Sequence, residues 1–301
     1  MPIPVLECSP MELVWDILAD ALIDTLRLVP FLFVTYLIIE AIEHKASEKT
    51  EALIEKAGAA GPLVGALVGI FPQCGFSAAA STLYAGRVIT LGTLIAVYLA
   101  TSDEMLPVLL AEQADIGLIA TIMVSKLVIG IIMGFLIDGI YRIVRKGKHE
   151  HINIHPLCEH DHCGCGEEKG GILRSATIHT LQVTLFVFLI TLVIDAIIAV
   201  IGENALATFL DAQPFFSVVA SATVGLIPNC AASVVITELF LDGTISTAAM
   251  MSGLLVSAGI GLLVLFRANA SIKQNIGILG ILWATGVVWG LLFLATGISF
   301  S

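Results

Sequence analysis

Long runs of predominantly apolar residues are the feature that most constrains the fold of this chain. Four runs cover residues 26–43, 116–141, 175–201 and 275–298, and a fifth covers 244–266. A helix that crosses the hydrocarbon core of a bilayer needs about 20 such residues. Only 13% of the 301 residues are charged, whereas soluble proteins carry roughly 25%. The sequence therefore predicts an all-α polytopic membrane protein and excludes a soluble enzyme.

The charge balance excludes a second class of function. Asp and Glu number 25 against 14 Lys and Arg, so the formal net charge is −11. Proteins that bind nucleic acid neutralise phosphates with Lys and Arg, so we expect no nucleic-acid partner. Residues 1–25 contain acidic residues but no Lys or Arg, unlike a signal peptide, which begins with basic residues. This segment is predicted to form an amphipathic helix at the membrane surface.

The basic residues predict the topology. Twelve of the fourteen lie in four loops, at 45–56, at 87, at 142–174 and at 267–273. Basic loops stay in the cytoplasm, so these loops are expected inside and both termini outside the plasma (inner) membrane. Each half of the chain then crosses the membrane an odd number of times.

The chain also contains an internal repeat. The segment 69–77 aligns with 225–233, and 130–134 aligns with 286–290, both at a spacing of 156 residues. Together with the odd number of crossings, this predicts two inverted transmembrane repeats, at 26–141 and 175–301. Inverted repeats are typical of secondary transporters, which bind substrate where interrupted helices of the two repeats meet.

A Pro-Gln-Cys and a Pro-Asn-Cys tripeptide are the most informative motifs. Pro72 and Pro228 each separate two short apolar pieces, so each repeat is expected to hold a Pro-broken or re-entrant helix pair. Such backbone is tolerated in lipid only where it is buried in protein or lines a cavity. The substrate-binding candidates here are Gln73, Cys74, Ser77, Asn229, Cys230 and Ser233. The alternative is that these side chains only pack or satisfy backbone groups.

A polar break interrupts the apolar stretch 88–111. It contains three further substrate- or ion-binding candidates, Ser102, Asp103 and Glu104. Charges within a membrane helix are costly and usually line a pathway or bind an ion. Alternatively, the break is the end of a helix, and residues 105–111 lie in the membrane interface.

Other ionisable residues fall inside the predicted spans. Glu40, Asp195 and Lys126 are candidates for proton coupling, although the first two could be ordinary interface residues. Lys126 lies in the middle of its span and must either find a partner, which could be one of these carboxylates, or extend its ammonium to the membrane surface. Asp138 lies close to the cytoplasmic end of the same span and is interpreted as solvated.

The central loop, 142–174, is rich in metal-ligating side chains. They are His149, His151, His155, Cys158, His160, His162, Cys163 and Cys165. Imidazole and thiolate bind zinc, copper, nickel and related ions. The spacing differs from that of structural zinc sites, so we expect a flexible tract that collects metal ions; the alternative is a solvated linker.

Three common nucleotide-binding and catalytic motifs are missing from the sequence. It contains no phosphate-binding loop of the form G-x-x-x-x-G-K-[ST], no H-E-x-x-H and no G-x-S-x-G. We therefore expect no enzymatic activity and no required cofactor. Transport would draw on an ion or proton gradient.

On the two Pro-containing tripeptides, the polar break at 101–104 and the His/Cys-rich loop, the chain resembles the ten-transmembrane heavy-metal exporter family. This family is related by name to the arsenic permeases and is often labelled as manganese transporters. The resemblance extends from about residue 20 to the end. It implies an exporter of a metal or metalloid.

The resulting hypothesis is a secondary transporter that exports a heavy-metal or transition-metal cation, or a metalloid, by alternating access. A carrier of an organic anion or other small solute is one alternative, and a membrane metal sensor without transport is another. The expected partners are membrane lipid and the metal ion. The glycine spacings at 130–134 and 286–290 allow close helix packing within one chain or within a homo-oligomer.

Overall fold

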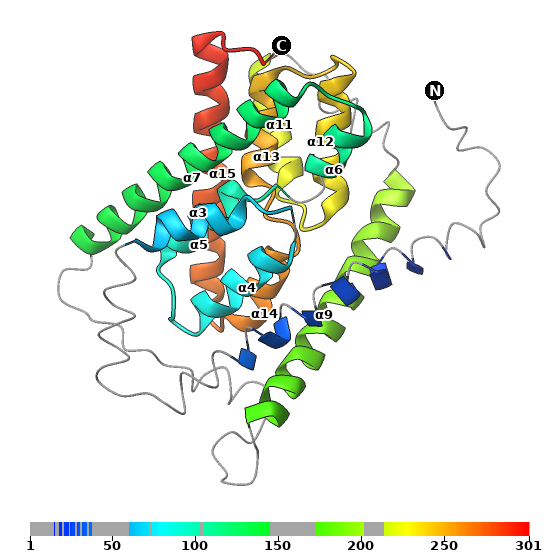
Figure 1. Cartoon of the computed structure of the whole chain (residues 1–301), viewed down its shortest axis with the longest axis vertical. Helices are drawn as coiled ribbons and strands as arrows, with labels where there is room; N and C mark the ends of the chain where they lie inside the picture. The colour runs from blue at the N-terminus through cyan, green and yellow to red at the C-terminus, as the bar shows by residue number, and fades with distance from the viewer. Residues whose placement is uncertain are drawn as a thin grey trace.

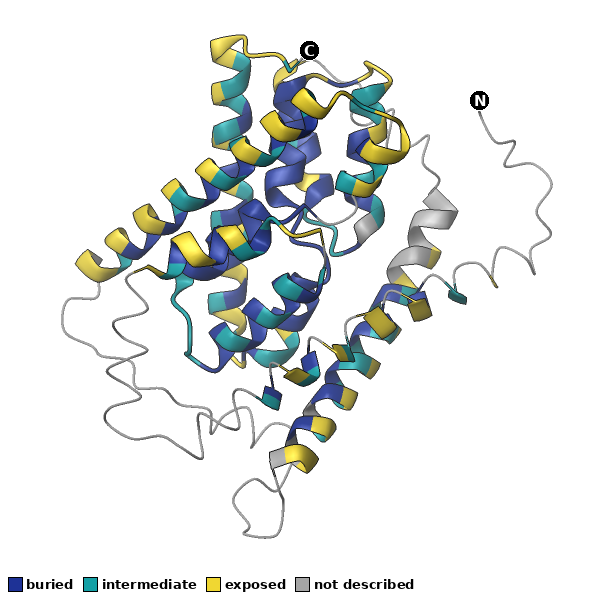
Figure 2. Ribbon diagram, viewed as in Figure 1, coloured by how far each residue is buried: buried dark blue, intermediate teal, exposed yellow. Residues whose placement is uncertain are grey.

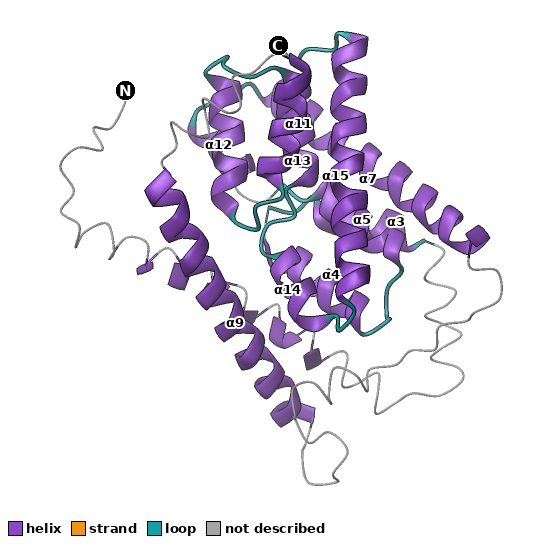
Figure 3. Ribbon diagram, turned by 180° about the vertical axis from the view of Figure 1, so that it is seen from behind, coloured by secondary structure: helices purple, strands orange, loops and turns teal. Residues whose placement is uncertain are grey.

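The computed structural model describes residues 60–72, 74–102, 105–144, 172–201 and 214–300, with scattered positions between 15 and 37. Within these residues the regular structure is α-helical and contains no strand (Figure 3). The helices of the first half are α3 (Gly61–Gly69), α4 (Cys74–Ala85), α5 (Leu91–Ala100), α6 (Met105–Ala111) and α7 (Ile116–Val144). Those of the second half are α9 (Ile172–Ile201), α11 (Pro214–Gly225), α12 (Cys230–Leu241), α13 (Thr247–Val256), α14 (Gly261–Ala268) and α15 (Ile272–Thr296).

Five stretches of the described residues are long and apolar enough to cross a membrane. They are Leu91–Ala111, Ile116–Ile143, Ala176–Val193, Thr247–Ala268 and Ile272–Thr296. This agrees with the predicted class, an all-α membrane protein.

Two of these five stretches are interrupted helices. Leu91–Ala111 contains α5 and α6, and Thr247–Ala268 contains α13 and α14. The sequence analysis identified a polar break near residue 101 and treated 244–266 as one apolar run. The structure interrupts this run as well, because Ser257 has an extended backbone (ψ 91°) and Gly259 a left-handed φ of 53°. Neither conformation continues an α-helix, so the chain leaves the helix here and re-enters it at Gly261.

The helices of the two halves correspond at a spacing of 156 residues. Helices α4 and α12 begin and end 156 residues apart, as do α5 and α13. Thr90 caps α5 and Ser246 caps α13, each by accepting a hydrogen bond from the backbone N three residues later. The turns after α4 and α12 contain Arg87 and Gly243, which have left-handed φ values of 60° and 73°. Local backbone geometry therefore recurs along with the sequence motifs.

The glycines at the two G-x-x-x-G spacings pack within the chain. A Cβ on Gly134 of α7 would come within 3 Å of the carbonyl oxygen of Gly92 on α5. A Cβ on Gly290 of α15 would similarly approach the side chain of Ser252 on α13. These small residues let the long helices α7 and α15 approach the interrupted ones closely.

Helices α5 and α13 lie at the centre of the described fold. From Gly92 to Ala100 and from Thr247 to Val256 every residue is buried (Figure 2). The long helices α7, α9 and α15 instead expose large apolar side chains along one side, including Val128, Leu185 and Val288. An exposed apolar side suits contact with lipid, so the interrupted helices form the interior and the long helices form the outer layer.

Helix α9 lies beside the helical residues described between 15 and 37 (Figure 1). Buried positions of the two segments correspond at a spacing of 155 residues: Ala21, Thr25, Leu32 and Tyr36 in the first, Ala176, Thr180, Val187 and Thr191 in the second. In both segments the Thr hydroxyl donates to the carbonyl of the Ala four residues earlier, at 2.7 Å. The correspondence thus extends beyond the central helices.

Candidate functional site

The break between α5 and α6 is buried and rich in hydroxyl groups. Thr101 is 2% exposed and Ser102 is 1% exposed. The Thr101 hydroxyl donates to the carbonyl of Val97 at 2.8 Å, and the Ser102 hydroxyl donates to the carbonyl of Ala100 at 3.2 Å. The Val97 carbonyl also accepts a hydrogen bond from the backbone N of Thr101 at 2.9 Å, so both hydroxyls add to the hydrogen bonding at the end of α5. Asp103 and Glu104 come next and lie outside the described residues.

A lysine of the first half contacts the end of α13, next to the break between α13 and α14. Lys126 of α7 is 1% exposed, and its Nζ donates to the carbonyl oxygen of Leu254 at 2.7 Å. Leu254 lies in the last turn of α13, where carbonyls have no partner within the helix. The sequence analysis considered a carboxylate as partner of Lys126; that stays a prediction, because Glu40 and the side chain of Asp195 lie outside the described residues.

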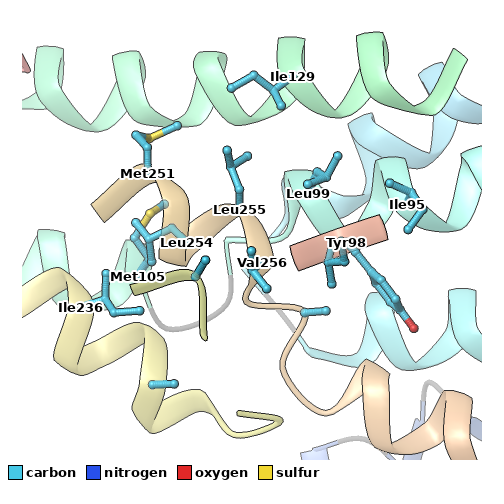
Figure 4. Packing of buried hydrophobic residues seen from close by; sticks show 14 of the residues in the cluster. Ile95, Tyr98, Leu99, Met105, Ile129, Ile236, Met251, Leu254, Leu255 and Val256 are labelled. Atoms are coloured by element: carbon cyan, nitrogen blue, oxygen red, sulfur yellow. The ribbon is translucent and has the colours of Figure 1, made fainter. Parts of the chain in front are cut away.

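The two interrupted helices meet at the centre of the described fold. Helices α5 and α13 are in contact, and each half also places its short helix against the other half, α6 against α12 and α14 against α4. Figure 4 shows Met105 of α6 in one apolar cluster with Leu254 of α13 and Ile236 of α12. Met105 directly follows Glu104, so the chain enters and leaves the 103–104 segment through the buried core.

Ser77, a predicted site residue, lies where α4 contacts α14. Its hydroxyl donates to the carbonyl of Cys74 at 2.8 Å. A Cβ on Gly261, the first residue of α14, would lie 2.8 Å from the Cβ of Ser77. Gly261 therefore permits the close approach of the two backbones at this position.

A buried polar cluster next to Ser77 was missed by the sequence analysis. The Ser81 Oγ lies 2.7 Å from the carbonyl oxygens of Ser77 and Gly261 and from the Tyr98 hydroxyl. The Tyr98 hydroxyl also donates to the carbonyl of Gly261 at 3.2 Å. One signal could have found Ser81, since it follows Ser77 by one helical turn and so shares its face. No local signal predicts that Tyr98 contacts α14.

The remaining residues of the two tripeptides have different surroundings. Cys74 is half-buried and packs against the cluster that contains Leu32, Val187 and Ile260. Asn229 is 5% exposed and caps α12, because its side-chain oxygen accepts a hydrogen bond from the backbone N of Ala231 at 2.9 Å. This is the backbone-satisfying role that was the alternative to ion binding.

The structure describes the other predicted site residues only in part or not at all. Ser233 is buried on α12, whereas only the backbone is described for Cys230 and for Asp195 on α9. Outside the described residues lie Gln73, Glu40 and the loop residues His149, His151, His155, Cys158, His160, His162, Cys163 and Cys165. Within the described residues no three His, Cys, Asp or Glu side chains lie close enough together to hold a metal ion.

Asp138 is buried, so its interpretation as a solvated residue in the sequence analysis was wrong. It is 9% exposed, and its Oδ2 accepts a hydrogen bond from the Thr90 hydroxyl at 2.6 Å. Its Oδ1 accepts one from the backbone N of Gly92 at 2.7 Å. The carboxylate thus closes the N-terminus of α5, where a negative charge is favoured by the helix dipole.

A family model for a transmembrane family matches residues 9–165, which is more than half of the chain. The description of this family reads "Putative, 10TM heavy-metal exporter". The chain belongs to this family. The resemblance inferred from the sequence motifs is thereby confirmed. No curated protein and no solved structure gives a significant match.

The region matched to the heavy-metal exporter family contains most of the candidate site. It includes Pro72–Cys74, the 101–104 break, Lys126 and the His/Cys-rich loop. The second half, with Asn229 and the α13–α14 break, lies outside the match. Its relation to the first half comes from the helices that correspond at a spacing of 156 residues.

Proposed function

We propose that this member of the heavy-metal exporter family is a secondary transporter. Its substrate would be a heavy-metal or transition-metal cation, or a metalloid, moved outward across the inner membrane by alternating access. The observation that carries this proposal is the contact between the interrupted helices α5–α6 and α13–α14 in the buried core. Non-helical backbone at membrane depth is tolerated only where it is buried in protein or lines a cavity, and transporters bind their substrates beside such breaks.

The two halves are proposed to be inverted repeats. The reciprocal contacts α4–α14 and α6–α12 support this, because a twofold axis that exchanges the halves also exchanges these two contacts. The basic loops support a cytoplasmic central loop with both termini outside. The proposed units stay those of the sequence analysis, residues 1–25, 26–141, 142–174 and 175–301.

The carboxylates of Asp103 and Glu104 are the proposed principal ligands of the metal. Ser102 flanks them, and oxygen ligands of this kind suit manganese. The thiols of Cys74 and Cys230 would favour a softer ion. The other proposed contacts are Gln73, Ser77, Asn229 and Ser233.

Separate residues are proposed to couple transport to protons and to supply the metal. Glu40, Asp195 and Lys126 are the candidates for proton coupling. The His/Cys-rich loop, 149–165, would collect metal ions on the cytoplasmic side. In this proposal the protein catalyses no reaction and needs no resident cofactor. It lies in the lipid bilayer, where it could form a homo-oligomer.

The test measures metal export directly. Cells expressing the protein are exposed singly to manganese, zinc, cobalt, nickel, copper, cadmium and arsenite, and their metal content is measured by mass spectrometry. We expect lower content of at least one element. The double variant Asp103→Asn/Glu104→Gln should lose this effect, because neutral amides bind cations weakly.

Two exposed acidic residues provide the matched control. Glu112→Gln/Asp242→Asn removes the same charge from the surface and should leave export unchanged. Unchanged content of every metal on expression would refute the exporter, and movement of an organic anion would then favour the solute carrier. Export that persists in the Asp103→Asn/Glu104→Gln variant would refute the site.

A further inference from the structure

The hydroxyls of Ser81 and Tyr98 make more oxygen contacts than their hydrogens can serve. The Ser81 Oγ lies 2.7 Å from three oxygens, the carbonyls of Ser77 and Gly261 and the Tyr98 hydroxyl. The Tyr98 hydroxyl also lies 3.2 Å from the Gly261 carbonyl oxygen. Each hydroxyl carries one hydrogen and a carbonyl carries none. Two hydrogens therefore serve four oxygen–oxygen contacts, so two of these contacts lack a hydrogen of their own.

These oxygens are enclosed by protein. Ser77 and Ser81 are 0% exposed, as is Tyr98, and Gly261 is buried at the start of α14. Figure 4 shows the Tyr98 hydroxyl directed away from the apolar cluster around Leu255 and Val256. Oxygens that approach one another without a hydrogen repel, and the repulsion is strong where no water screens it. A cation bound among them would replace this repulsion with attraction.

The cluster lies beside an interruption of each half. Ser77 belongs to the first turn of α4, which follows the break at Pro72. Gly261 is the first residue of α14 and follows the break after Val256. Transporters coordinate their coupling cations with carbonyls of unwound backbone at such breaks. A cation at this position would bind both halves of the chain at once, because α4 and α14 come from different halves.

We propose that the oxygen cluster of Ser77, Ser81, Tyr98 and Gly261 binds a sodium ion. The contacts described at the cluster come from hydroxyls and carbonyls. Neutral oxygens suit a monovalent cation, whereas sites for divalent ions are usually built with carboxylates. Oxygens only 2.7 Å apart converge more readily on sodium than on the larger potassium ion. Sodium bound here would couple export to the sodium gradient; this coupling rests on the proposed function, whereas the binding does not.

The second half offers a matched control at a spacing of 156 residues. Thr237 corresponds to Ser81, and its hydroxyl likewise donates to the carbonyl four residues earlier, that of Ser233, at 2.7 Å. Leu254 stands at the position of Tyr98 and Met105 at that of Gly261. The Leu254 side chain has no hydroxyl to complete such a cluster. Thr237→Val therefore removes an equally buried hydroxyl from a position where we expect no sodium site.

The first experiment measures thermal unfolding of the purified full-length protein in detergent. Sodium chloride should raise the Tm of the wild type by about 2–5 °C more than choline chloride of equal ionic strength, at roughly tenfold the Kd of sodium. Ser81→Ala and Tyr98→Phe should lose this rise, and Thr237→Val should keep it. A cluster that only ties helices together would give no rise in the wild type. That result, or an equal rise in Ser81→Ala and Tyr98→Phe, overturns the proposal, and an equal rise with potassium chloride overturns the choice of sodium.

A second measurement needs only the wild type, so it decides the proposal even if the variants do not fold. Hydrogen exchange is compared in sodium chloride and in choline chloride. Sodium should slow the exchange of backbone amides around the break and the start of α14, residues 257–265. The equivalent short helix α6, Met105–Ala111, should be unaffected. Equal protection of both segments, or protection of neither, overturns the site.

The coupling is tested in proteoliposomes loaded with the metal that the protein exports from cells. Export should be several-fold faster when sodium chloride rather than choline chloride is present outside. Export at the same rate in both salts would overturn the coupling but leave the sodium site. If the wild type exports no metal, the proposed function fails, and the Tm and hydrogen-exchange measurements still decide whether sodium binds.

Discussion

The carboxylate of Asp138 accepts a 2.6 Å hydrogen bond from the hydroxyl of Thr90, and this contact attaches α7 to the N-terminus of α5. The second carboxylate oxygen binds the backbone N of Gly92. A charged acceptor at this end of a helix satisfies groups that the helix leaves unpaired. The residue that corresponds to Asp138 in the second half is Leu294, so this position supplies no carboxylate to the N-terminus of α13, which Ser246 caps.

Asp138→Asn should therefore lower the free energy of unfolding by about 1–2 kcal/mol, because an amide replaces a charged acceptor of two hydrogen bonds. Thermal unfolding in detergent measures the change. The control Glu112→Gln removes an exposed charge and should shift stability by less than about 0.5 kcal/mol. Equal effects of the two substitutions would contradict the capping role.

The cluster of Ser81 and Tyr98 should behave as one unit. Both hydroxyls lie within hydrogen-bond distance of the Gly261 carbonyl oxygen and of each other. Ser81→Ala and Tyr98→Phe should each cost about 1–3 kcal/mol, since each leaves a buried partner unsatisfied. In a double-mutant cycle the coupling energy should exceed about 0.5 kcal/mol. Additive effects would mean that the two hydroxyls act independently.

Substitution of a glycine by alanine should destabilise the protein where the glycine lies at a helix contact, but not where it lies on an open face. A Cβ at Gly134 would contact Pro62, Gly92 and Ala96, so Gly134→Ala should destabilise the protein by about 1–3 kcal/mol. Gly139 lies five residues further along α7 with open space around its Cβ position. Gly139→Ala should be neutral or stabilising by about 0.5–1 kcal/mol, because Ala favours the helix. The comparison fails if both substitutions have the same sign and size.

Deletion of residues 149–166 should reduce metal export without abolishing it, because the loop is proposed to supply metal to a site elsewhere. The purified deletion variant should also contain less bound metal than the wild type, measured by mass spectrometry. A control that replaces the His and Cys residues of the loop by Ser keeps its length. Unchanged metal content and unchanged export in both variants would make the segment a simple linker.

The membrane class and the interruptions near Pro72, near Pro228 and near residue 101 could be predicted from the sequence, because they depend on neighbouring residues. Apolar runs of sufficient length predict the spans, and Pro72 and Pro228 predict the breaks between α3 and α4 and between α11 and α12. The spacing of 156 residues also aligned the motifs correctly with helices that share their bounds. Family membership followed from the same local motifs.

The pairing of polar groups was decided by the tertiary structure alone. Lys126 and Asp138 are both ionisable residues on α7, and nothing in their neighbouring residues indicates a carbonyl of α13 for one and the N-terminus of α5 for the other. The break after Val256 was likewise unexpected, since it occurs in an apolar run without a charge or a Pro. Local sequence determines where a helix can cross the membrane. The partner of each buried polar group depends on which distant helix packs against it, and that is known only when the chain is folded.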